Sequence, residues 1–229
     1  MDLSKSLEEI GKYFNEILGY LLPGLTIVCL VIFFLDPNQF PNYFDLADVN
    51  ILLLLFLSYV CGYIVYGLSL TIEKIKRKIK IISQDDDLIK KRISKQEDYR
   101  LSLEELHRLI PDLNSESLKF NDLRNIIMSY VPEIDQKIYT FMFRSDLFKH
   151  TQDIFLIISL WGFIAYISKP IFNNTLLFNV NGINIFLILI LFFLQFPLNE
   201  GKKRFLGIAY KIQFNIFLAK IHPIKYENK

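Results

Sequence analysis

The sequence has few of the residues that build catalytic or metal sites. It contains two cysteines, three histidines and nine glycines among 229 residues. Cys29 and Cys61 form no CxxC pair and no zinc-ligand spacing, which argues against a metal site or a redox motif. The histidines do not share a helix face at metal-ligand spacing, and no Gly-rich phosphate loop occurs. We therefore expect that the protein binds no cofactor and no metal, and that it is not an enzyme.

Charged residues are missing from four long stretches, although they make up 22% of the chain. Residues 17–35 and 51–72 lack any charge and match the ~20 residues that cross a ~30 Å hydrocarbon core. Residues 154–168 and 178–198 are also uncharged, and the Asn-rich turn between them predicts a helical hairpin. The sequence thus predicts an all-α integral membrane protein with four transmembrane helices. Spans without ionisable side chains disfavour an ion-coupled transporter.

Lys and Arg are absent from residues 36–50 and 170–182, which are the two predicted loops on one side. Sixteen lie in residues 73–151 and seven follow residue 199. Because basic residues concentrate in cytoplasmic loops, both termini and residues 73–151 are predicted to be cytoplasmic. The composition, rich in Ile, Lys and Asn, suggests a bacterium and therefore its inner membrane. The first 16 residues lack a positive signal-peptide region, so we expect the first apolar segment to be retained.

The chain divides by composition into four segments. We predict an N-terminal segment with the first transmembrane hairpin, a cytoplasmic helical domain, a second transmembrane hairpin and a basic cytoplasmic tail. Their bounds are residues 1–72, 73–151, 152–199 and 200–229. The tail is either a helix lying on the inner leaflet or a helix packed on the central domain. The net charge of +2 is too small to imply nucleic-acid binding, so no direct nucleic-acid partner is expected.

Short motifs predict the helices of residues 73–151. Asp85–Asp87 indicate a helix start with Ser83 as its cap, in preference to a cation site. Ser102 and Glu105 form a second capping-box pattern, and Pro111 should end that helix. Another helix is predicted over residues 115–130, and the segment after Pro132 should continue into the third span.

Basic residues flank the inner ends of the second and fourth spans, where anionic head groups would attract them at roughly 1 kcal/mol each. The alternative is that they act only as a topology signal. The candidate head-group contacts are Lys74, Lys76, Arg77, Lys78, Lys80, Lys202, Lys203 and Arg204.

The second span carries small residues on one helix face, namely Ser58, Gly62 and Ser69, with Tyr63 and Tyr66 on an adjacent face. Ser58 and Gly62 make a small-xxx-small pair, which lets helix backbones approach closely. This face either packs within the chain or forms an oligomer interface or pore lining.

Three segments resemble a group of small, uncharacterised bacterial membrane proteins with several spans: LGYLLPGL (18–25), CGYIVYGLSLTIEKI (61–75) and FRSDLFKHT (143–151). Some proteins of this kind are similar to membrane effectors of anti-phage defence systems. The resemblance implies no catalytic residues. The uncharged spans, the small-residue face of the second span and the attached cytoplasmic segment lead us to expect an oligomeric, non-enzymatic protein that alters membrane permeability when its cytoplasmic domain receives a signal or partner.

Two alternatives remain open at this point. The chain could be a membrane anchor or scaffold that recruits a cytoplasmic partner through residues 73–151. It could also be a membrane-bound enzyme acting on lipid or RNA, because Arg100 and His107 resemble the Arg-x4-6-His pairing of HEPN ribonucleases.

Overall fold

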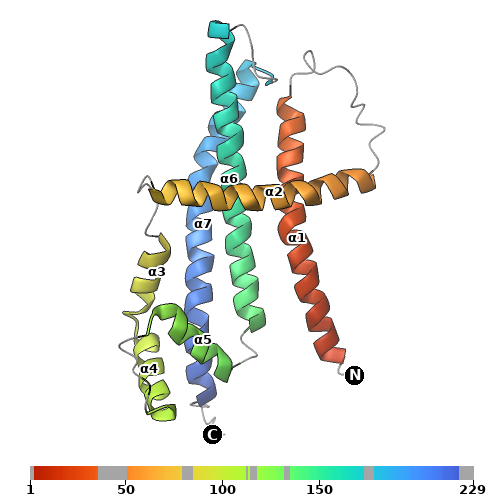
Figure 1. Ribbon diagram of the computed structural model, residues 1–229. Helices are drawn as coiled ribbons and strands as arrows, with labels where there is room; N and C mark the ends of the chain where they lie inside the picture. The colour runs from red at the N-terminus through yellow and green to blue at the C-terminus, as the bar shows by residue number, and fades with distance from the viewer. Residues whose placement is uncertain are drawn as a thin grey trace, which may run out of the picture. The chain divides into compact units, whose positions relative to one another are not determined.

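The chain is helical throughout the part that its computed structural model describes (Figure 1), which comprises residues 3–35, 51–78, 85–111, 113, 118–131, 135–172 and 178–221. The helices are α1 (Leu3–Phe34), α2 (Ile51–Lys78), α3 (Asp85–Ile93), α4 (Glu97–Leu109), α5 (Phe120–Tyr130), α6 (Asp135–Phe172) and α7 (Gly182–Ile221). Strand pairing in these residues is limited to an isolated antiparallel bridge between Leu35 and Phe178. The all-α prediction is confirmed.

Four helices are long and apolar enough to cross a membrane. The candidate spans are Ile17–Phe34, Ile51–Ile75, Ile138–Ile171 and Gly182–Ile221. Their number agrees with the prediction, and the first two have nearly the predicted bounds. The third and fourth are parts of much longer helices, since α6 has 38 residues and α7 has 40.

The start of α7 differs from the prediction by a few residues. Phe178 was expected to open the fourth span, but it lies in the bridge with Leu35 and packs its ring on Phe34 at 5.1 Å. The helix begins at Gly182 because the side chain of Asn181 accepts a hydrogen bond from the backbone N–H of Asn184 at 2.7 Å. Asparagine is a preferred cap, since its side-chain oxygen satisfies a free N–H of the first turn.

The chain forms two compact units, which we describe separately. The first comprises Met1–Ile79 and Asp146–Lys202, and we call it the apolar unit. The second comprises Lys80–Ser145 and Lys203–Lys229, and we call it the aromatic-core unit. Both α6 and α7 continue as unbroken helices from residues of one unit into residues of the other.

The aromatic-core unit is built around side chains that are almost fully buried. Leu106 of α4, Leu123 and Ile127 of α5, and Phe214 and Phe217 of α7 are at most 1% exposed. The rings of Tyr99 and Phe120 add to this core: they lie parallel with centroids 5.9 Å apart, and each meets Phe214 edge-on. Such aromatic contacts add to the free energy gained by removing apolar area from water.

The second half of α7 belongs to this core, which answers the question about the tail. Leu206, Tyr210, Phe214 and Phe217 are buried in the same cluster as the α4 and α5 side chains. The hydroxyl of Tyr210 also donates a hydrogen bond to Asp86 Oδ1 at 2.7 Å. Of the two alternatives, the structure favours packing on the central helices.

Two predicted helix starts are wrong. Ser102 does not cap α4, because the helix begins at Glu97 with Gln96 as its N-cap, and the buried Ser102 hydroxyl donates instead to the backbone oxygen of Asp98 at 2.7 Å. This bond to the residue four positions earlier is typical of serine inside a helix. The next helix, α5, begins at Phe120 with Lys119 as its N-cap, so Leu118 and Lys119 are not helical, contrary to the prediction, whereas residues 114–117 lie outside the described part of the chain.

Other local predictions hold. The helix α3 begins at Asp85, and Asp86 forms an ion pair of 2.8 Å with Lys90 one turn later. The helix α4 ends at Leu109, just before Pro111. The predicted cap at Ser83 and the expected role of Pro132 lie outside the described residues.

Candidate functional site

The predicted small face of α2 is buried within the apolar unit. Ser58 and Ser69 are fully buried, and Gly62 is buried as well. A Cβ on Gly62 would collide with the backbone carbonyl of Tyr20, and a Cβ on Gly24 would collide with the backbone carbonyl of Ser58. Glycine at these two positions therefore permits α1 and α2 to touch through their backbones. The contact is made within one chain.

The predicted aromatic face of α2 is half-exposed. Tyr63 stacks on Tyr20 of α1 with ring centroids 4.0 Å apart, and its hydroxyl lies 3.0 Å from that of Tyr59. Tyr66 lies edge-on to Tyr20 and near the ring of His150. Tyr63 and Tyr66 remain 48% and 41% exposed, so within a single chain they cover an outer surface and do not line an enclosed channel.

Two polar contacts join α2 to α6, and the sequence analysis missed both. The hydroxyl of Ser69 lies 3.0 Å from Nδ1 of His150 in a buried hydrogen bond. One turn further along α2, Oε2 of Glu73 lies 2.6 Å from Nζ of Lys149. We call these four residues the α2–α6 polar contact. Figure 1 shows α2 crossing both α1 and α6, in agreement with these contacts and with the glycine positions.

This contact changes the description of the third span. The sequence analysis placed that span at residues 154–168 and found no ionisable side chain in any span. The candidate span in the structure, Ile138–Ile171, also includes Lys149, His150 and Asp153. His150 and Asp153 are both buried, and their spacing of three residues puts them on one face of α6. No local pattern links them to α2, because 81 residues separate His150 from Ser69.

The basic residues predicted to meet lipid differ in exposure. Lys74, Lys78 and Arg204 are exposed, whereas Lys202 and Lys203 are partly buried. The side chains of Lys76 and Arg77, and all of Lys80, lie outside the described residues.

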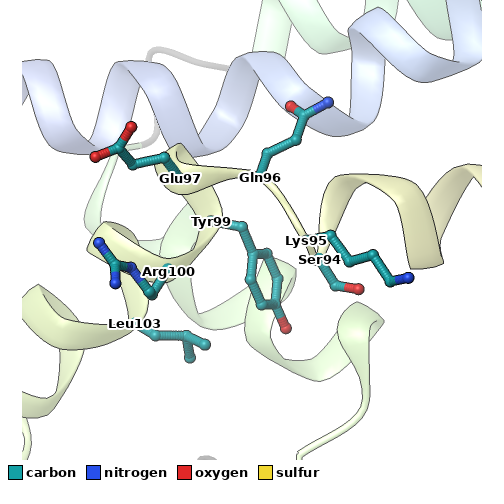
Figure 2. A pocket seen from close by; sticks show the side chains of 7 residues that line it. All are labelled: Ser94, Lys95, Gln96, Glu97, Tyr99, Arg100 and Leu103. Atoms are coloured by element: carbon teal, nitrogen blue, oxygen red, sulfur yellow. The ribbon is translucent and has the colours of Figure 1, made fainter.

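A shallow cavity of about 410 Å³ lies at the turn between α3 and α4 (Figure 2). Its lining comes from a single stretch of ten residues and includes Tyr99 and Arg100. Burial raises the pKa of the Tyr99 hydroxyl above its usual value. His107 does not line this cavity, so the cavity gives no support to the ribonuclease alternative, which needs Arg100 and His107 together.

The comparisons with known proteins give no further indication of function. No protein-family model, curated protein or solved structure matches the chain.

Proposed function

We propose that this protein is a non-enzymatic, oligomeric protein of the bacterial inner membrane, and that it alters membrane permeability when its aromatic-core unit receives a signal or protein partner. One observation carries the proposal: α6 and α7 each run as an unbroken helix through residues of both units. A continuous helix is an element that can pass a displacement along its length to a distant packing contact.

The location in a membrane is supported by the surface of the apolar unit. Large apolar side chains stand exposed along α2 and the first half of α7, for example Phe56 at 63% and Phe196 at 64%. Exposing such a surface to water costs free energy, whereas exposing it to lipid tails does not. The basic residues of 73–151 and of the tail support a cytoplasmic side for both. Reporter fusions at residues 40, 95 and 176 test this topology, and an external residue 95 would contradict it.

A role in permeability is supported by four helices that are long and apolar enough to cross a membrane and by the resemblance to membrane effectors of defence systems. Induced expression in bacteria, read with a membrane-potential dye, tests it. We expect depolarisation once the triggering partner or infection is present. An intact potential under triggering conditions would contradict the proposal.

A scaffold that recruits a cytoplasmic partner is the second candidate, and the well-packed core of the aromatic-core unit favours it. The two functions differ in what they need from the spans. Replacing residues 17–72 by an unrelated transmembrane hairpin should leave a scaffold active but should abolish an effector. The partner should bind both forms in a pull-down experiment.

A further inference from the structure

The α2–α6 polar contact is an unusual element for an apolar unit. Ser69 is fully buried, His150 is 6% exposed, and the Lys149 side chain that pairs with Glu73 is largely covered. Charged and polar groups removed from water are costly unless each finds a partner. Contact between these side chains therefore stabilises the structure. Removing one member of a pair is more destabilising than removing both.

The rest of α2 is held differently. Its contact with α1 passes through Gly24 and Gly62, where backbones touch, and the buried hydroxyl of Ser58 in that contact has no hydrogen-bond partner in the structure. Its apolar contact with α6 is small, with Val65 in one cluster with Ile154 and Ile158. Polar side chains thus join α2 to α6 through the contacts of Ser69 with His150 and of Glu73 with Lys149.

Two features make this contact suitable for a switch. Ser69 and Glu73 are four residues apart and lie on one face of α2, so both meet α6 at the same place. Lys149 and His150 are adjacent on α6, so a rotation or shift of that helix would act on both pairs together.

We propose that Ser69, Glu73, Lys149 and His150 form a latch that holds α2 against α6 in the resting state, and that breaking this latch opens the apolar unit to ions. This inference rests on the proposed function, and it names the residues at which a signal carried by α6 would act.

The test uses the full-length protein in vesicles of phosphatidylethanolamine and phosphatidylglycerol. The decay of a potassium diffusion potential is measured for the wild type, Glu73→Gln, Lys149→Met and the charge swap Glu73→Lys with Lys149→Glu. Each single change should speed the decay by about tenfold or more, because it removes the ion pair between Lys149, whose side chain is 18% exposed, and Glu73, which is 35% exposed. The swap restores opposite charges and should return the rate toward that of the wild type. Lys169→Gln, an exposed position on the same helix, is the matched control.

The outcomes separate the latch from the proposed function. If the wild type depolarises triggered cells but both single variants stay as tight as the wild type in vesicles, the latch is wrong and the function stands. If the swap leaks as much as the single variants, pairing is not what holds the contact and the latch is also wrong. If no triggered cell depolarises and no variant leaks, both fail. Should a single variant not fold, as judged by gel filtration, Ser69→Ala supplies the same comparison by removing one hydroxyl.

Discussion

The two units use the same kinds of apolar side chains in opposite ways. In the aromatic-core unit Phe214 and Phe217 are fully buried, whereas in the apolar unit Phe56 and Phe196 are mostly exposed. Burial of apolar area is driven by water, and lipid offers no such driving force between helices. The comparison shows that the same kinds of side chain form a closed core in one unit and an exposed surface in the other, although two helices are shared between them.

Their internal contacts differ accordingly. The aromatic-core unit is held by interlocking rings from α4, α5 and α7. In the apolar unit, α2 is held by a close backbone approach to α1 and by the α2–α6 polar contact. If this contrast is correct, a substitution should lower the stability of the unit that contains it more than that of the other, although α6 and α7 are shared. The sole tryptophan, Trp161, lies in the apolar unit and contacts Phe178, so its fluorescence reports on that unit alone.

The largest effect is expected from Phe214→Ala. Removing a fully buried ring should lower the free energy of unfolding of the aromatic-core unit by about 3–5 kcal/mol. Thermal unfolding in detergent, followed by circular dichroism and by Trp161 fluorescence, should show an early loss of helix with an unchanged fluorescence transition. Asn215→Ala, at the exposed neighbouring position, is the control. A fluorescence transition that moves equally would mean that the two units unfold as one.

Gly62→Ala should destabilise the apolar unit. The added methyl group meets the backbone of Tyr20, which cannot move aside as a side chain would, so we expect a loss of about 2–3 kcal/mol. Here the Trp161 fluorescence transition should shift to lower temperature. Gly67→Ala is the matched control on the same helix, because nothing lies within 4 Å of its Cβ position, and it should be neutral or stabilise by about 1 kcal/mol. If the fluorescence transition shifts equally in the two variants, the backbone contact between α1 and α2 does not explain the loss of stability.

Tyr210→Phe tests how much the Tyr210 hydroxyl, as distinct from ring packing, stabilises the aromatic-core unit. It keeps the ring but removes the hydroxyl that donates to Asp86, whose side chain is 41% exposed. A hydrogen bond to a partly solvated carboxylate should contribute about 1 kcal/mol. Chemical denaturation measures the change, and a loss as large as that of Phe214→Ala would show that the hydroxyl, and not ring packing, secures α7.

The smallest effect is expected from Arg108→Ala. Arg108 is 72% exposed and pairs with Glu105 one turn earlier at 2.7 Å. Glu105 is 12% exposed, but the guanidinium that pairs with it lies mostly in solvent, so a helix pair at this spacing should contribute about 0.2–0.5 kcal/mol, and less in high salt. The same denaturation experiment, repeated in 1 M salt, should erase the difference from the wild type.

The sequence predicted what depends on length and composition. The uncharged stretches at 17–35 and 51–72 were sufficient for two spans, because crossing lipid requires a run of apolar residues. The capping pattern at Ser102 failed because a serine that bonds within its own helix looks the same in sequence as one that caps it. The polar contact could not be predicted, since its partners lie 76 and 81 residues apart and pair only through tertiary packing.

The place of α7 in the chain has a consequence for biosynthesis. Leu106, Leu123 and Ile127 leave the ribosome well before Phe214 and Phe217, which cover them. The aromatic-core unit can therefore close only after all four apolar stretches have been synthesised. A nascent or prematurely terminated chain would hold its spans without a completed core, and its uncovered apolar residues would mark it for chaperones and proteases.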